Sequence, residues 1–291
     1  MTTVATSLGA CSDGDDEGAR RAAPAAPSGS ETTGQRAIAS GDGWSLPPAD
    51  ASWDYQLDEA YDPADGVTVV ARDWYWSTPL EDAYSICYVN AFQTQRDDDT
   101  VERPDELGSW PPDVVLTDLP DDPNWPGEYL VDLSSAATRA TAAAHIHPIF
   151  EVCSEKGFDA VELDNLDSWT RLEDEDVRVP FGQREAVAYA ALLADRAHGL
   201  GMAVAQKNTP QLDAEESIES VGFDFAIAEE CGEYDECDVY EEVFGDLLFV
   251  VEYTEDGFEA ACEAVGHRVS VVFRDKDLAS PDAGDHRYEA C

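Results

Sequence analysis

Short apolar segments with the composition of β-strands recur eight times along this chain, and helical segments separate most of them. Parallel strands joined by helical crossovers form an open sheet or a closed barrel, and eight repeats favour the barrel. We therefore expect an α/β fold, a TIM-like (β/α)8 barrel built as a single domain. The segments predicted as strands are 52–57, 67–73, 85–91, 158–163, 202–208, 223–229, 247–253 and 268–273. The segments predicted as helices are 136–156, 182–198, 210–220 and 255–265.

The 291 residues of the chain suffice for one such barrel, which typically needs about 250 residues. We assign residues 44–280 to the barrel and residues 281–291 to a C-terminal tail. Residues 12–43 are rich in small and polar residues and hold almost no large apolar side chain, so we expect a disordered tether. Residues 1–11 end in Leu-Gly-Ala-Cys, which looks like the end of a truncated bacterial lipoprotein signal with Cys11 as the lipidation site.

The chain is strongly acidic, with 63 acidic against 17 basic residues and a formal net charge of -46. Such a charge repels nucleic acid and anionic membranes, so neither is an expected partner, and membrane attachment would come only through a lipid at Cys11. A hydrated surface suited to high salt explains the charge, and attraction of a cationic polymer is compatible with it. The expected location is extracellular or at the cell surface.

Six cysteines remain when Cys11 is set aside, and an even number suits an oxidising compartment. Spacing alone does not give their pairing, but Cys231 and Cys237 enclose a short acidic loop and are the best candidates for a disulfide. The sequence has no Cys-x-x-Cys pair and no His at zinc spacing from these thiols. We expect no metal site and no cofactor.

Polar side chains gather where the predicted strands end. The stretch 156–169 runs through a buried strand and delivers Glu162, Asp164 and Asp167 close together. In a barrel of parallel strands, the carboxyl ends of the strands form the face where chemistry takes place. Asp159 and Asp224 lie near strand starts, so we interpret them as hydrogen-bonded structural acids. The polar residues at the strand ends are Asp73, Asn90, Asp164, Lys207, Asn208, Glu229 and Glu252.

Two carboxylates on different strands, facing each other across a cleft lined with aromatic rings, are what glycoside hydrolysis requires. Flat aromatic faces pack against sugar rings. The sequence contains no Ser nucleophile elbow, no Gly-rich phosphate loop and no HExxH helix, which disfavours esterase, kinase and metalloprotease activities. Aromatic residues near the predicted strand exits and loops are Trp74, Tyr75, Trp76, Trp125 and Trp169.

Several motifs occur in consistent order over residues 44–273: ICYVNA, RPD, WPGEYLVDL, GFDAVELDNLDSW, AHGLGMAVAQKN, FDFAIAEECGEYDECDVYEEVF and FVVEY. Together they resemble glycoside hydrolase family 114, of the endo-α-1,4-polygalactosaminidase type. The resemblance implies a TIM-like barrel that cleaves within an α-1,4-linked galactosamine-containing polysaccharide.

The resemblance gives Asp164 the role of nucleophile and Glu229 the role of general acid/base. Cys231 and Cys237 match a closely spaced cysteine pair of the family. This chain departs from the family pattern on both sides of the general acid/base, where Ala228 replaces Asn and Glu230 replaces Gln. The residues expected to bind substrate are Asp73, Asn90, Glu162, Asp167, Trp169, Lys207, Asn208, Glu252 and Tyr253.

Two other functions stay open on the sequence. The barrel could be a noncatalytic carbohydrate-binding surface lipoprotein whose acids only bind sugar. Ca²⁺ could lie among the acids, although the loop pattern of an EF-hand is missing. Lys207 has two interpretations as well, because it could keep Asp164 ionised for catalysis or simply balance a buried acid.

Overall fold

A computed structural model describes residues 43–49, 51–95 and 110–291. The predicted signal over residues 1–11, the lipidation site Cys11 and all but the last residue of the predicted tether lie outside these residues. Within the described residues, no helix is both long enough and apolar enough to cross a lipid bilayer.

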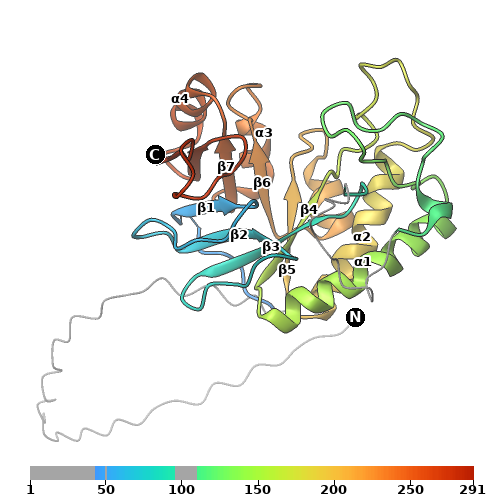
Figure 1. Ribbon diagram of the computed structural model, residues 1–291, viewed down its shortest axis with the longest axis horizontal. Coiled ribbons are helices and arrows are strands. Elements are labelled where there is room, and N and C mark those ends of the chain that lie inside the picture. Colours follow the sequence, from blue (N-terminus) through green and yellow to red (C-terminus); the bar gives the residue numbers. More distant parts are fainter. Residues whose placement is uncertain (1–42, 50, 96–109) are drawn as a thin grey trace, which may run out of the picture. The chain divides into compact units, whose positions relative to one another are not determined.

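Eight parallel strands follow one another in sequence order around a single sheet, and this confirms the predicted TIM-like barrel (Figure 1). Each of these strands begins and ends within two residues of the bounds predicted for it. A ninth strand, β9 (Tyr288–Ala290), pairs antiparallel with the last parallel strand and was not predicted. The parallel strands are β1 (Trp53–Gln56), β2 (Val69–Asp73), β3 (Tyr84–Asn90), β4 (Ala160–Asp164), β5 (Ala203–Lys207), β6 (Phe225–Glu229), β7 (Leu248–Glu252) and β8 (Ser270–Arg274).

The first and last parallel strands are linked through side chains. Arg274 of β8 is fully buried, and its Nη1 donates to Asp54 Oδ1 of β1 at 2.7 Å and to the backbone carbonyl of Tyr55. Strand β9 lies on the edge of β8 opposite β7, and Tyr288 Oη donates to the carbonyl of Trp53 at 2.9 Å. These contacts link β1 to β8 through side chains, while the backbone edge of β8 pairs with β9 and not with β1.

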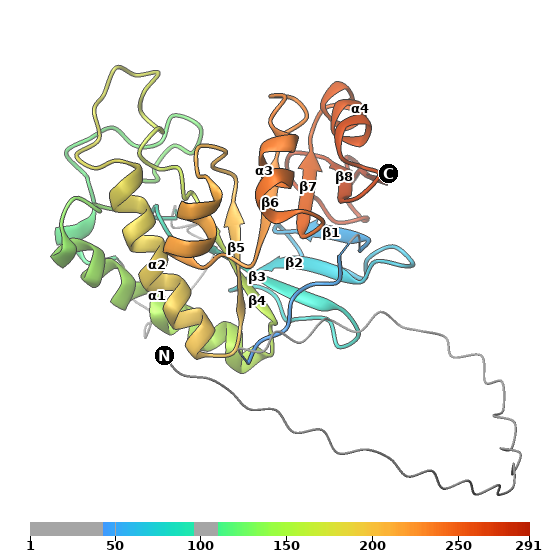
Figure 2. The ribbon, with the colours of Figure 1, turned by 180° about the vertical axis from the view of Figure 1, so that it is seen from behind.

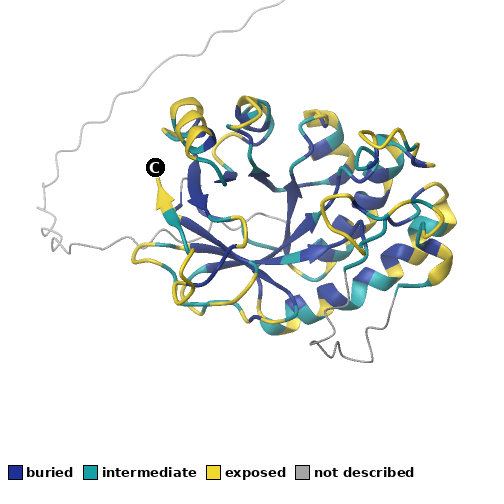
Figure 3. Cartoon of the chain, turned by 45° about the horizontal axis from the view of Figure 1, so that its top comes forward, coloured by how far each residue is buried: buried dark blue, intermediate teal, exposed yellow. Residues whose placement is uncertain are grey.

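Each strand divides its side chains between two apolar layers, because successive side chains point to opposite faces. One buried cluster fills the barrel interior and the other lies between the strands and the helices; Figure 3 shows buried strands and exposed outer helix faces. Residues of the inner cluster include Trp53, Tyr55, Ala71, Ile86, Ala205, Phe225, Ile227, Phe249, Val251 and Val272.

The helices cover the later strands. Helix α1 has the predicted bounds: the Ser135 hydroxyl caps it by accepting from Thr138 N at 3.1 Å, and Gly157 ends it at φ 95°. Helices α1 and α2 lie side by side (Figures 1 and 2). Helix α3 was not predicted. The helices are α1 (Ala136–Lys156), α2 (Gln183–Gly199), α3 (Cys237–Phe244) and α4 (Glu255–Ala264), with a 3-10 turn η1 (Pro112–Val114) and a π-helical segment η2 (Glu215–Val221).

The two acids at the strand starts hold structure together, as predicted. Asp224 accepts from Trp44 Nε1 at 2.9 Å and from the backbone N–H of Val204 at 2.8 Å, and its second partner side chain is His198. Asp159 accepts from the backbone N–H of Ser85 at 2.8 Å. Both carboxylates therefore satisfy buried donors at the end of the barrel opposite the strand exits.

Three disulfides use all six cysteines from Cys87 onward. Cys87–Cys153 joins β3 to α1, and Cys231–Cys237 closes the loop between β6 and α3. Cys262–Cys291 ties α4 to the end of the chain, so residues 281–291, assigned to a tail, are held by this disulfide and by β9. Such a density of disulfides is typical of an oxidising, extracellular compartment.

Candidate active site

Four charged side chains project inward from three neighbouring strands near the carboxyl ends of those strands. Glu162 and Asp164 lie two residues apart on β4, so both point into the barrel, and Lys207 and Glu229 are the last residues of β5 and β6. The strands are parallel neighbours: Leu163 pairs with Gln206, so Asp164 lies beside Lys207, and Lys207 pairs with Ile227, so Glu229 lies two residues further along β6.

Lys207 is the centre of this group. Its Nζ lies 2.8 Å from Asp164 Oδ1, 2.9 Å from Glu229 Oε2 and 2.9 Å from Glu162 Oε1, and its side chain is only 2% exposed. Asp164 and Glu229 are thus brought to one atom although 64 residues separate them in the sequence. Their nearest oxygens therefore lie no farther apart than the sum of these two distances to Lys207 Nζ.

A tyrosine hydroxyl donates to each of the three carboxylates. Tyr88 donates to Asp164 Oδ2 at 2.6 Å, Tyr55 donates to Glu162 Oε1 at 2.7 Å, and Tyr253 donates to Glu229 Oε1. Sequence reasoning missed Tyr55 and Tyr88. Strand alternation was the available signal, because both residues share the inward parity of their strands.

The opposite charges of Asp164 and Lys207 keep both of these side chains ionised. Burial raises the pKa of Asp164, but the adjacent Lys207 charge and the hydrogen bonds from Lys207 and Tyr88 outweigh burial and bring this pKa below its usual range. Burial lowers the pKa of Lys207, but Asp164, Glu162 and Glu229 together raise it well above its usual range. Asp164 is therefore held as a carboxylate beside a charged ammonium group.

Glu162 lies beneath this pair and has a different environment. It is fully buried, and within the described residues its Oε2 has no hydrogen-bond partner. Burial is the largest effect on its carboxyl group and raises the pKa to about 7, against the charge of Lys207. The contacts of Glu162 are with Tyr55 and Lys207, and it lies inside the barrel, one inward position before Asp164 on β4.

Replacing Glu162 with Gln tests this environment. In the folded protein the pKa of Glu162 is raised from 4.5 to about 7, so the folded state binds this proton more tightly than the unfolded state does. Protonation therefore stabilises the fold, and this stabilisation is lost as the pH rises through 7. We expect the free energy of unfolding of the wild type to fall relative to Glu162→Gln by about 3 kcal/mol between pH 4.5 and pH 7. Urea denaturation across this range measures the difference, and parallel pH profiles would contradict it.

Three more of the expected substrate-binding residues lie at the strand exits and are held by local hydrogen bonds. Asn208, at φ 46°, accepts from the backbone N–H of Glu229 at 2.7 Å. Asn90 accepts from Asn165 Nδ2 at 3.1 Å. Asp73 accepts from the backbone N–H of Tyr75 at 2.7 Å in the loop after β2.

The remaining expected residues are spread more widely. Tyr253 joins the cluster through Glu229, while Asp167 pairs with Arg171 at 3.0 Å. Trp169 lines an open pocket within the loop after β4. Glu252 has the opposite strand parity from the inward Val251 and lies away from the cluster. It accepts from the backbone N–H of Gly232 at 2.6 Å, and burial raises its pKa to about 7.

The structure also separates the two adjacent acids at the end of β6. Glu229 contacts Lys207, whereas the next residue, Glu230, lies 3.2 Å from Lys276 Nζ in a different environment. Among the described residues, one group of possible metal ligands comes together, formed by Cys231, Cys237 and Glu252. Its two sulfurs are bonded to each other, so it offers no thiolate.

A TIM-like barrel with acids paired at its strand ends defines a class that includes many glycosidases. The family model of glycoside hydrolase family GH114 matches residues 33–291. The chain belongs to this family, so it is a glycoside hydrolase and the catalytic interpretation of the barrel replaces the noncatalytic one.

One solved structure shares the fold. The crystal structure of Aspergillus fumigatus Ega3 in complex with galactosamine is 22% identical, with a TM-score of 0.68 over 85% of this chain and 98% of that chain. Arthrobacter globiformis T6 isomalto-dextranase complexed with panose is 12% identical, with a TM-score of 0.38 over 67% of this chain and 42% of that chain. No curated protein matches the chain.

Proposed function

We propose that this glycoside hydrolase cleaves within an α-1,4-linked galactosamine-containing polysaccharide, with Asp164 as nucleophile and Glu229 as general acid/base. The observation that carries the proposal is the convergence of both carboxylates on Lys207 Nζ at the carboxyl ends of β4, β5 and β6. A nucleophile must stay ionised, and Lys207 provides this for Asp164 through charge and a hydrogen bond.

The reaction proceeds in two displacement steps. Asp164 attacks the anomeric carbon while Glu229 gives its proton to the departing glycosidic oxygen, so that an Asp164 glycosyl ester forms and the shortened polymer leaves. Glu229 then takes a proton from water, which attacks the same carbon and releases Asp164 as a carboxylate. The short separation of the nearest oxygens supports this retaining scheme, in which the carboxyl groups lie about 5 to 5.5 Å apart.

A cationic substrate suits the charge of the chain. Unacetylated galactosamine units carry an ammonium group, and the net charge of -46 attracts a polycation towards the barrel. The solved structure with the same fold was determined with galactosamine bound, which supports an amino-sugar substrate. Attraction of this kind weakens as salt screens the charges, so we expect the apparent KM for the polymer to rise with ionic strength.

The test is release of reducing ends from an α-1,4-linked galactosamine polymer, with NMR of the first product to determine its anomeric configuration. We expect internal cleavage and an α-configured reducing end. No release from any α-linked amino-sugar polymer would overturn the substrate, and a β-configured first product would overturn the retaining mechanism. Polymer binding without cleavage by the wild type would contradict the assigned roles of Asp164 and Glu229.

A further inference from the structure

The short loop after β2, residues 74–77, carries an exposed tryptophan where the chain leaves the carboxyl end of that strand. Trp76 is 52% exposed. The loop begins beside β3, because Trp74 N donates to the carbonyl of Tyr88 at 3.2 Å, and the Tyr88 hydroxyl donates to Asp164. One strand therefore separates this loop from the proposed nucleophile.

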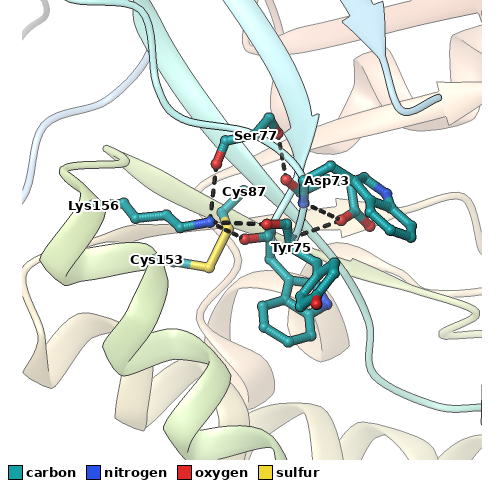
Figure 4. Close-up of a disulfide and its surroundings, with 8 residues drawn as sticks. Asp73, Tyr75, Ser77, Cys87, Cys153 and Lys156 are labelled. Carbon is teal, nitrogen blue, oxygen red and sulfur yellow. Dashed lines mark hydrogen bonds between the residues drawn. A yellow bond between two sulfur atoms is a disulfide. The ribbon is translucent and has the colours of Figure 1, made fainter. Parts of the chain in front are cut away.

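Side chains from two other elements fix the backbone of this loop (Figure 4). Lys156, the last residue of α1, donates through Nζ to the carbonyls of Trp74 at 2.5 Å, Tyr75 at 3.3 Å and Ser77 at 2.9 Å. From the other side, Asp73 Oδ1 accepts from the backbone N–H of Tyr75 and, at 3.4 Å, from that of Trp76. The loop is thus held at three carbonyls and two N–H groups.

The disulfide next to the loop holds Lys156 in place. Cys153 lies one helical turn before Lys156, and its bond to Cys87 ties this end of α1 to β3 (Figure 4). Because the helix end and the loop are both tied to neighbouring strands, the backbone at Trp76 is fixed before any ligand arrives. A preorganised loop avoids the entropic cost of ordering on binding.

The distribution of exposed apolar side chains distinguishes this ring from scattered surface residues. Among the described residues, five large apolar side chains are exposed. The aliphatic ones, Leu192 and Ile218, lie on α2 and η2. The aromatic ones, Trp76, Trp125 and Tyr234, lie in segments that follow β2, β3 and β6, and each of these segments begins at the carboxyl end of its strand.

We propose that the Trp74–Ser77 loop is a carbohydrate subsite in which the indole face of Trp76 stacks on a pyranose ring of the polymer, away from the bond that is cleaved. The apolar C–H face of a sugar packs on an aromatic ring, so the ligand is a glycan. Because the subsite lies away from the cleaved bond, this glycan must be several units long. Trp76 contacts Tyr75 in a T-shaped geometry, with centroids 4.9 Å apart, and is not stacked on it. This subsite rests on the proposed function for its polymer.

Trp76→Ala in the full chain tests the subsite. We expect kcat/KM for long polymer to fall about tenfold, chiefly through KM, and the rate on a small activated galactosaminide to change less than about twofold. Trp76→Phe retains a ring and should recover part of the loss. Leu192→Ala, which removes an exposed apolar side chain from α2, is the matched control. Equal losses on long and short substrates, or no loss, would overturn the subsite.

Lys156 is a positioning residue in this scheme and gives an independent variant. Lys156→Met should raise KM for long polymer and leave kcat on the small substrate near wild type, and Lys156→Arg should restore part of the binding because it keeps the donors. A fall in kcat on both substrates would instead indicate a general structural role and count against the proposal. Thermal unfolding of each variant shows whether the barrel is retained.

A binding assay separates failure of the subsite from failure of the proposed function. The Asp164→Asn protein should retard in gels that contain galactosamine polymer, and adding Trp76→Ala should reduce the retardation. If the wild type cleaves nothing but this difference appears, the proposed reaction is wrong and the subsite stands. If Asp164→Asn and Asp164→Asn with Trp76→Ala bind the polymer equally, or neither binds, the subsite is wrong.

Discussion

Replacing Asp164 with Asn is expected to lower the rate of polysaccharide hydrolysis by a factor of about 10³ or more, and Glu229→Gln by about 10² to 10⁴. Asn cannot attack the anomeric carbon, and Gln cannot give a proton to the departing oxygen. Both substitutions keep the size of the side chain and its contact with Lys207, so the fold should be unchanged by circular dichroism. Reducing-end assays on the purified proteins measure the loss.

Substrates with different leaving groups distinguish the nucleophile Asp164 from the general acid/base Glu229. An activated aryl glycoside has a leaving group that needs little protonation, so Glu229→Gln should lose much less activity on it than on the polymer. Asp164→Asn should lose activity on both substrates, because each requires the nucleophile. Glu230→Gln is the matched control, since Glu230 is adjacent in sequence but faces Lys276. Equal losses in Glu229→Gln and Glu230→Gln would contradict the assignment.

Much of this site follows from strand alternation and from the closure of a parallel sheet. The sequence predicts that Asp164, Lys207 and Glu229 end neighbouring strands, and parallel pairing then brings these strand ends together at one end of the sheet. Glu252 also lies at the end of a strand, but it is one residue out of phase with the inward Val251. Strand ends alone therefore locate the active face, and only the phase of each strand shows which polar residues enter the barrel.

Other features depend on contacts that no local pattern records. The pairing of Cys87 with Cys153 and of Cys262 with Cys291 requires the packing of α1 on β3 and the return of the chain end to α4. Strand β9 has three residues, too few for a periodic pattern, and it forms because the edge of β8 is available. Such pairings follow from tertiary structure and not from spacing.

Lys207→Met is expected to lower the free energy of unfolding by about 3 to 5 kcal/mol and to abolish hydrolysis. Met keeps most of the apolar stem but removes the only ammonium group in contact with Glu162, Asp164 and Glu229 in the described residues. The buried carboxylates then repel one another without a counter-charge. Urea denaturation measures the change. Lys276→Met is the control, because Lys276 is 69% exposed and its pair with Glu230 should contribute less than about 1 kcal/mol.

The pH dependence shows whether charge or packing causes this loss. Without Lys207, the pKa of Asp164 is no longer held below its usual range, so the carboxyls protonate at higher pH and the deficit should shrink as the pH falls. Without Lys207 the pKa of Glu162 rises above about 7, so adding Glu162→Gln to Lys207→Met removes a repelling charge only at higher pH and should recover part of the stability in alkaline solution. A deficit that is the same at every pH, with no recovery in the double variant, would mean that Lys207 stabilises the barrel by packing. In that case Lys207 would not be what keeps the proposed nucleophile ionised, and the charge on Asp164 would need another source.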